Sequence, residues 1–220
     1  MPIYKKINKN FFKKWTGGMA YVLGFIFADG NIVYTKRHTW FWSIQITDKE
    51  ILEKIKKEID SSHIISEKKK IQNNKQLYRL QIGSKDMCND LLRLGLTEKK
   101  SKTILFPEIP KKYFSDFLRG YFDGDGGVWI GLKNKNQKSK TYTISTFFTS
   151  GSKDFLISLK YNLANRGLLG GSLIKKERGF DLKYSVKDSL ILYKIMYNNE
   201  CSLFLKRKKE RFEKYITMRS

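Results

Sequence analysis

Two short segments of the chain repeat one pattern: an apolar run with glycine at its third position, ending in Asp-Gly. They are residues 22–30 and 118–126. Each run is apolar around its whole circumference apart from a few residues, and the residues that follow alternate with the two-residue period of a strand. The pattern predicts two buried helices, each followed by a strand, with Gly30 and Gly126 as C-cap residues.

Small residues recur four positions apart in both segments. Gly24 is followed by Ala28 in the first, and Gly120 by Gly124 in the second. Residues four apart lie on the same face of a helix, so each segment has one face without bulky side chains. Two such faces let helix backbones approach closely. We therefore expect the two helices to pack side by side, with their C-terminal ends at the same level.

This pairing brings together the carboxylates of Asp29 and Asp125, the last acidic residue of each segment. A carboxylate at a helix C-terminus faces the negative end of the helix dipole, and two such groups also repel each other. Hard divalent cations with oxygen ligands are the simplest partners that relieve this repulsion. The alternative is that Asp-Gly is only a common turn sequence. It fits one segment well but explains poorly why both follow the same apolar run.

The repeated segment resembles the name-giving motif of the LAGLIDADG homing endonucleases, in the single-chain form with two motifs. The resemblance implies that Asp29 and Asp125 are the catalytic metal ligands. One departure is visible, since the first motif has Phe27 where the family pattern has its first Asp, whereas the second keeps Asp123. The catalytic position is intact in both copies.

The order of expected elements also repeats. Strands are expected at 31–34, 40–47, 63–69 and 76–82, and again at 127–132, 142–149, 171–176 and 181–186. Helices are expected from 48, at 84–94, 111–123, 152–165 and 187–197, and at 205–215. We expect a first half at 1–95, a linker at 96–110 and a second half at 111–220 that ends in a basic helix. The fold class is mixed α/β. The resemblance implies two tandem pseudo-symmetric αββαββα units, with the motif helices at their seam and saddle-shaped antiparallel sheets facing DNA.

Composition independently favours a nucleic-acid partner. Lys and Arg number 44 against 21 acidic residues, a net charge of +23 on 220 residues, and such an excess attracts polyanions. No apolar stretch is long enough to span a bilayer, which argues against a membrane partner. With only Cys88 and Cys201, a disulfide framework is not expected, and an intracellular compartment is indicated. His38 and His63 alone do not build a zinc site.

Alternate side chains of a twisted β-ribbon can read base edges in the major groove. A one-residue error in register would exchange every DNA contact for a core residue. The DNA-binding candidates of the first half are Tyr34, Trp40, Trp42, Ser43, Gln45, Lys68, Lys70, Gln72, Tyr78, Arg79 and Gln81. Those of the second half are Trp129, Lys133, Asn134, Lys140, Tyr142, Thr146, Lys175, Lys176 and Lys183.

Hydrolysis of a phosphodiester needs a placed water and positive charge on the phosphate oxygens. Asp29 and Asp125 are expected to hold Mg²⁺, with Mn²⁺ able to substitute and Ca²⁺ able to bind without supporting cleavage. Gln45 resembles the family's glutamine near the scissile phosphate, and Lys187 its active-site lysine. Gln45 as an ordinary base reader and Lys187 as a surface residue remain equally open. Lys85 in the first copy is expected to be offset from the position of Lys187.

The sequence therefore predicts a homing endonuclease that makes a double-strand break in a long DNA site. Because two motifs supply both halves of the site, we expect a monomer. Two alternatives stay open: a maturase that binds intron RNA, and a non-cleaving transcription regulator of the same fold. Retention of Asp29 and Asp125 argues against the second of these but not against the first.

Overall fold

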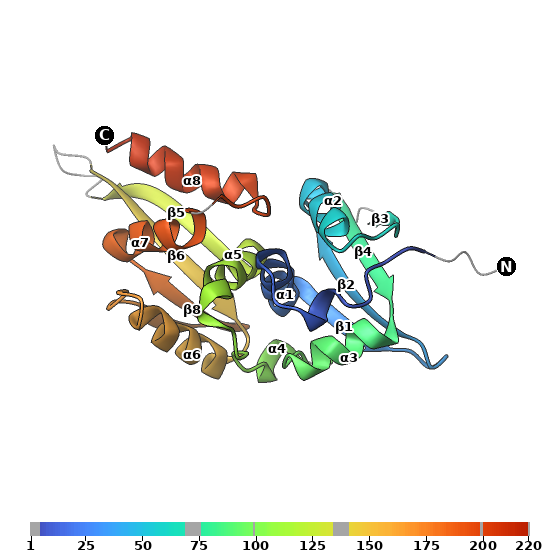
Figure 1. Ribbon diagram of the computed structural model, residues 1–220. Coiled ribbons are helices and arrows are strands. Elements are labelled where there is room, and N and C mark those ends of the chain that lie inside the picture. Colours follow the sequence, from blue (N-terminus) through green and yellow to red (C-terminus); the bar gives the residue numbers. More distant parts are fainter. Residues whose placement is uncertain (1–4, 69–75, 99, 134–140, 199, 220) are drawn as a thin grey trace. The chain divides into compact units, whose positions relative to one another are not determined.

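The computed structural model describes residues 5–68, 76–98, 100–133, 141–198 and 200–219. The first part of the chain contains α1 (Gly17–Asp29), β1 (Gly30–Tyr34), β2 (Trp40–Ile46), α2 (Lys49–Glu58), β3 (Ile65–Lys68), β4 (Leu77–Gly83) and α3 (Lys85–Arg93). A short 3-10 helix, η1 (Phe11–Lys13), precedes them. The strands form a four-stranded antiparallel sheet in the order β1-β2-β4-β3 (Figure 1).

The second part repeats this order. It contains α5 (Phe114–Asp125), β5 (Gly126–Lys133), β6 (Thr141–Ser150), α6 (Lys153–Ala164), β7 (Ser172–Lys176), β8 (Gly179–Tyr184) and α7 (Val186–Tyr197). The sheet order is β5-β6-β8-β7, again antiparallel throughout. Outside the repeat lie α4 (Lys100–Thr103), η2 (Lys111–Tyr113) and α8 (Lys206–Thr217). The predicted fold class, two pseudo-symmetric α/β halves with antiparallel sheets, is confirmed.

Contacts divide the chain into two compact units. Unit 1 comprises residues 1–100 and 107–124, and unit 2 comprises 101–106 and 125–220. The second motif helix, α5, thus packs with unit 1 up to Gly124, although it begins the second sequence repeat. The expected boundaries at 95 and 110 concern the sequence repeats and stay a prediction.

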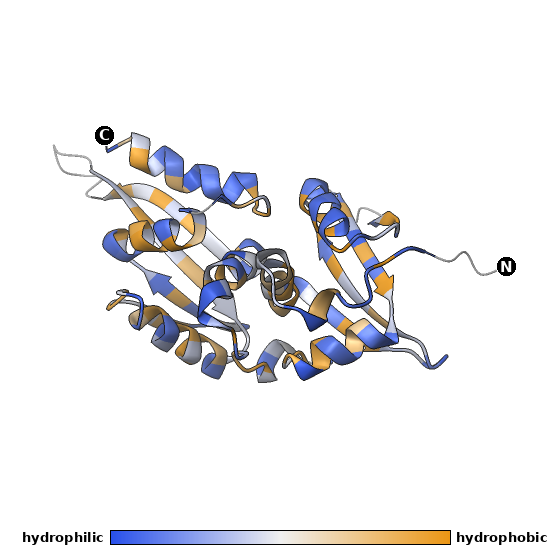
Figure 2. Ribbon diagram, in the orientation of Figure 1, coloured by the Kyte–Doolittle hydropathy of each residue, from blue (hydrophilic) through white to orange (hydrophobic). Residues whose placement is uncertain are grey.

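Each sheet buries one face beneath helices. In unit 1, Trp42, Ile44, Leu80 and Ile82 are fully buried on that face. Helix α2 adds an amphipathic stripe, and Ser84 caps α3 by accepting a hydrogen bond from the backbone N–H of Met87. Figure 2 shows the alternation of hydrophobic and hydrophilic residues along the strands and the hydrophilic outer sides of α2 and α8. The cores therefore follow the two-residue and helical periods of the sequence.

The two motif helices pack closely within unit 1. A Cβ atom on Gly24 would lie 2.1 Å from the carbonyl oxygen of Phe117, and one on Gly120 would lie 2.0 Å from that of Tyr21. Real Cβ atoms do not approach backbone oxygens this closely, so both positions need glycine. The predicted side-by-side pairing of α1 and α5 is confirmed.

Gly30 is the C-cap residue of α1, as the sequence predicts, and its backbone is extended, with a φ of −86° and a ψ of 165°. A Cβ at this position would lie 2.6 Å from the Cγ2 atom of Ile26. Gly30 is therefore explained by crowding at the exit of the helix and not by a positive φ.

Candidate nucleic-acid interface

Both motif aspartates are the last residues of their helices. Asp29 closes α1 and is exposed, and Asp125 closes α5 and is half-buried. Within unit 1, a Cβ on Gly124 would lie 2.3 Å from the Cβ of Ala28 and 3.5 Å from the backbone nitrogen of Asp29. The backbone of Asp29 therefore lies next to Gly124, the residue that precedes Asp125. Both carboxylates follow helix ends that carry negative partial charge.

The donor set at these positions suits magnesium. Across the part of the chain that the structure describes, three or more His, Cys, Asp or Glu side chains never gather as a metal-binding group. Asp29 and Asp125 would offer a divalent cation their carboxylate oxygens, the ligand type that Mg²⁺ prefers. Mg²⁺ is typically bound in this way, through one or two carboxylates, retained waters and phosphate oxygens. A zinc site with four protein ligands does not fit.

Asp123, the other acidic residue of the second motif, has a different environment. It is fully buried, and its Oδ2 accepts a hydrogen bond of 2.8 Å from the hydroxyl of Tyr21 on α1. The matching residue of the first motif, Phe27, is buried against Phe117 with ring centroids 5.6 Å apart. The two motifs thus differ at a packing position between α1 and α5. This explains why the departure at Phe27 leaves the terminal aspartates unaffected.

The sheet of unit 1 presents a polar face opposite its core. Strand pairing places Ser43 between Asn31 on β1 and Gln81 on β4, and places Gln45 opposite Arg79. The Ser43 hydroxyl donates to Oδ1 of Asn31 at 2.6 Å. Lys68 on β3 belongs to the same face, because it pairs with Leu77, two residues before Arg79. The sequence analysis did not include Asn31 among the residues of this polar face. Its place two residues after Asp29 could have indicated it.

One predicted contact of unit 1 is wrong. Trp42 lies on the core face and is fully buried, so it does not reach DNA. Tyr34, Trp40 and Tyr78 share its face by strand register but lie at strand ends, where Tyr34 is 45% exposed and the other two are half-buried. The error is one of register in an aromatic-rich strand, where large residues occupy both faces. Lys70 and Gln72 lie outside the described residues.

Unit 2 has a corresponding polar face with different residues. Trp129, Phe147 and Lys183 occupy it, and the ammonium of Lys183 lies 6.0 Å from the ring centroid of Trp129. Asp181 accepts a hydrogen bond of 2.8 Å from the Thr149 hydroxyl and pairs with Lys176 at 3.3 Å. The predicted candidates Trp129, Lys176 and Lys183 therefore share one face.

The remaining candidates of unit 2 fall elsewhere. Thr146 is fully buried on the core face, so this predicted contact is wrong. Tyr142 and Lys175 share the face of Thr146 by register, although both are exposed. Lys133 closes β5, paired with Thr141. Asn134 and Lys140 lie outside the described residues.

Lys85 and Lys187 occupy similar but not identical places in the two copies. Ser43 pairs with Gln81, and the corresponding Phe147 pairs with Lys183. Lys85 follows Gln81 by four residues, just as Lys187 follows Lys183. Both lysines are exposed in the first turns of α3 and α7. Lys85 is nevertheless the first residue of α3, whereas Lys187 is the second residue of α7, so the two lysines are offset by one residue from the helix starts, as expected.

Gln45 is exposed at a comparable point of unit 1. It directly follows Ile44, which pairs with Gly30 at the end of α1, so Gln45 is one residue along β2 from that end. Thr149 holds the same place in unit 2, because Phe148 is the partner of Gly126. The two copies thus place different polar groups beside their motif ends. The roles of Gln45 and Lys187 in catalysis stay predictions.

Groups outside these faces are less suited to chemistry. Burial raises the pKa of the Cys88 thiol to about 12, which keeps it protonated and unreactive. Burial, with the nearby charges of Lys5 and Lys56, lowers the pKa of His63. Among the described residues, the helices are all too short or too polar to cross a membrane.

Comparisons with known proteins agree with this geometry. The chain matches no family model. It is 25% identical to an uncharacterized protein of Methanocaldococcus jannaschii over 206 residues, which cover 90% of this chain and 71% of that protein.

Similar solved structures include the homing endonuclease I-WcaI bound to its DNA recognition sequence, with a TM-score of 0.62, 23% identity, and 92% and 90% of the two chains covered. The LAGLIDADG meganuclease I-AabMI bound to uncleaved DNA has a TM-score of 0.62, 14% identity, and coverage of 90% and 88%. I-SmaMI bound to uncleaved DNA with calcium ions has a TM-score of 0.60, 13% identity, and coverage of 93% and 90%. The chain thus has the fold of the LAGLIDADG homing endonucleases, as its two motifs predict.

Proposed function

We propose that the protein is a sequence-specific homing endonuclease that makes a double-strand break in a long DNA site by metal-dependent hydrolysis. The observation that carries the proposal is the retention of both motif aspartates at the ends of helices that pack through Gly24 and Gly120. A protein that only binds DNA has no need of two carboxylates at the negative ends of two helices. The net charge of +23 and the similar structures with bound DNA support a duplex DNA partner.

In this mechanism the carboxylates of Asp29 and Asp125 would hold Mg²⁺. When bound, the metal supplies positive charge for the phosphate oxygens and a water of lowered pKa. Gln45 hydrogen-bonds and orients the attacking water on its side. Lys85 and Lys187 stabilise negative charge that accumulates on the phosphates as the bonds break. Each motif serves one strand.

The polar sheet faces supply recognition. Side chains two residues apart on a strand point to the same side, so Arg79 and Gln81 can contact successive base edges, while the buried Ser43 holds Asn31 in place. The two faces differ in nearly every residue, which suits a target whose halves differ. Because one chain carries both motifs, the active species is a monomer on an asymmetric site.

Selection of cleaved sites from a randomised duplex library in Mg²⁺ tests this proposal. We expect the recovered ends to define one long asymmetric site cut on both strands. If the protein cuts no duplex yet binds intron RNA more tightly than DNA, it is a maturase. If it enriches a duplex sequence without cutting it, it is a transcription regulator. Either result would overturn the endonuclease assignment.

A further inference from the structure

Two side-chain contacts between α1 and α5 differ in their chemistry, although they join corresponding positions of the two motifs. Tyr21 directly precedes the first motif and Phe117 the second. Phe27 and Asp123 each stand sixth in their motifs. The Tyr21 hydroxyl donates to Oδ2 of Asp123 at 2.8 Å, whereas Phe27 packs edge-on against Phe117 with ring centroids 5.6 Å apart. The helix pair therefore has one polar contact and one aromatic contact.

The backbones of the two helices contact each other in the same way from both sides. A Cβ on Gly24 would lie 2.1 Å from the carbonyl oxygen of Phe117, and one on the matching Gly120 would lie 2.0 Å from that of Tyr21. Exchange of the two helices thus leaves the close backbone approach unchanged and exchanges the polar contact with the aromatic one. The glycines alone do not distinguish an α1–α5 pair from a pair of two α5 helices.

The side chains do distinguish these pairs. If α5 paired with α5 of a second copy, Asp123 of each chain would face Phe117 of the other, without the hydroxyl that Tyr21 supplies. Asp123 is fully buried in the α1–α5 pair, so water does not replace a missing donor there. Burial of a carboxylate against an apolar ring is costly, and hydrogen bonds to charged groups are stronger than those between neutral groups. The carboxylate thus favours α1 as the partner of α5.

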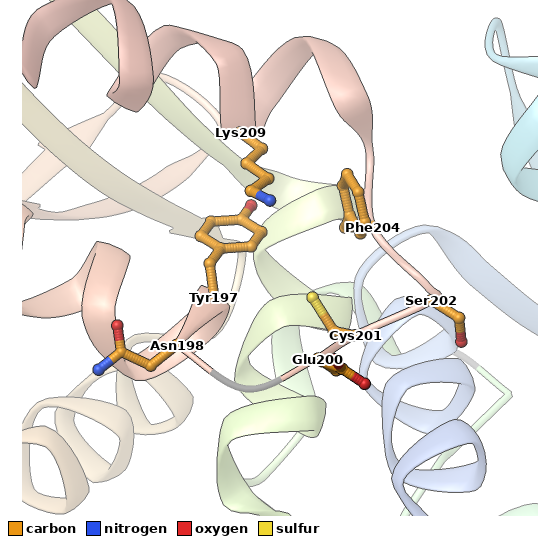
Figure 3. A pocket seen from close by; sticks show the side chains of 7 residues that line it. All are labelled: Tyr197, Asn198, Glu200, Cys201, Ser202, Phe204 and Lys209. Carbon is orange, nitrogen blue, oxygen red and sulfur yellow. The ribbon is translucent and has the colours of Figure 1, made fainter. Parts of the chain in front are cut away.

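The buried cation of α5 does not make this distinction. The Arg119 guanidinium pairs with Asp116 on its own helix and lies 5.6 Å from the ring centroid of Tyr21. Tyr and Phe rings both accept a cation. Unit 2 shows the same for Lys209, whose ammonium points toward a Tyr ring and a Phe ring at an open pocket beside α8 (Figure 3). The selective group is therefore the carboxylate and not the guanidinium.

We propose that Tyr21, Phe27, Phe117 and Asp123 form a pairing code that makes α5 select α1 of its own chain and reject α5 of a second copy. The code also gives Phe27 a role. An aspartate at this position would face Phe117, which has no hydroxyl to donate. The inference concerns the choice of helix partner and does not depend on whether the protein cuts DNA.

Moving one hydroxyl from α1 to α5 tests the code. The full-length double variant Tyr21→Phe/Phe117→Tyr has the composition of the unmodified chain, but its hydroxyl reaches Asp123 only when α5 meets α5 of a second copy. Light scattering at one protein concentration should give a monomer for the unmodified chain and a dimer for this variant. Phe117→Tyr alone is the control and should stay monomeric, because Tyr21 is retained.

A quadruple variant mirrors the code. Tyr21→Phe/Phe27→Asp/Phe117→Tyr/Asp123→Phe again has one polar and one aromatic contact between α1 and α5, with the two places exchanged. It should return to a monomer. The single variant Tyr21→Phe should lower the folding equilibrium constant by about 10-fold or more, as expected for a lost hydrogen bond to a charged group. Chemical denaturation measures this loss.

A monomeric, folded double variant would overturn the inference. If the double variant does not fold, the quadruple variant decides, and a folded monomer then supports the code. A quadruple variant that is dimeric or unfolded would overturn it, because complementary contacts would then not determine the pairing.

Discussion

The two sheets share strand order and register but differ in the chemistry of their polar faces. Beside the end of α1 the face carries Asn31, Ser43 and Gln81, whereas the corresponding places beside α5 carry Gly127, Phe147 and Lys183. One register step away, Gln45 and Arg79 correspond to Thr149 and Asp181. On the core faces the same comparison pairs Ile44 with Phe148 and Leu80 with Leu182, all buried. Core residues changed as well, since Trp42 and Ile82 correspond to Thr146 and Tyr184, but they stay buried, whereas the outward residues changed in charge.

This difference indicates where each kind of substitution acts. In the proposed function, residues that differ between the two polar faces would adapt each half to its own part of the target. Helix α8 extends the asymmetry, since it covers the β5 edge through Lys208 and Arg211.

The largest effect on stability is expected at the two motif glycines. Gly24→Ala and Gly120→Ala each place a methyl group about 2 Å from a backbone oxygen that cannot rotate away. Each should lower the free energy of unfolding by about 3 kcal/mol, the upper end for overpacking, and the two effects should be similar. Chemical denaturation measures both. Gly83→Ala is the control, since its Cβ would meet only the Trp40 carbonyl oxygen at 4.0 Å. Unequal losses would show that α1 and α5 are not equivalent.

Much of this scaffold is readable from the sequence because packing imposes regular spacing. The four-residue steps of Gly24 and Gly120 predicted the helix pair, and the two-residue period predicted the strands. Register was harder to predict. Trp42 and Thr146 were expected to contact DNA and are core residues, because aromatic and hydroxyl side chains occur on both faces of these strands.

The contacts of Lys208 and Arg211 with β5 join residues that lie more than 80 positions apart in the chain. The spacing of residues in the sequence does not reveal such contacts directly. The polar character of the site was therefore predictable, but which side chains converge was not.

The two lysines at shared positions should each act on one strand. Lys85→Ala and Lys187→Ala should slow cutting of opposite strands by about 100-fold, the loss typical for one group that stabilises transition-state charge. End-labelled duplexes report each strand separately. Lys153→Ala, at the exposed first position of α6, is the matched control. Equal slowing of both strands by either variant would contradict the assignment of one lysine to each half.

Arg79 and Asp181 occupy corresponding places with opposite charge, so neutralising them should have opposite effects. Arg79→Gln should weaken binding to duplex DNA and reduce the salt slope by about 1. Asp181→Asn should tighten binding several-fold, because it removes a negative charge from the polar face and releases Lys176 from its ion pair. Fluorescence anisotropy over a salt series measures both. A change of the same sign in both variants would show that the two faces do not bind DNA in the same manner.

The smallest effect concerns pH. Both histidines of the chain belong to unit 1, and His63 has a pKa lowered by burial and by Lys5 and Lys56. Below about pH 6.5, His63 is therefore protonated more readily in the unfolded chain than in the folded protein. Stability is therefore retained above that pH and falls as the pH drops from 7.5 to 5.5. His63→Gln should flatten this dependence in thermal melts, and an unchanged dependence in this variant would contradict the assignment to His63.

Substitution of the motif aspartates tests the central claim most directly. Asp29→Asn and Asp125→Asn should each abolish double-strand cleavage in Mg²⁺ and leave metal-free DNA binding largely intact. In chelator each should melt at the same or a higher temperature, because a charge at the negative end of a helix is removed. Asp154→Asn, an exposed aspartate in the first turn of α6, should cut normally. Cleavage by both single variants at the unmodified rate would contradict the account, and unfolding of either would show that its aspartate is structural.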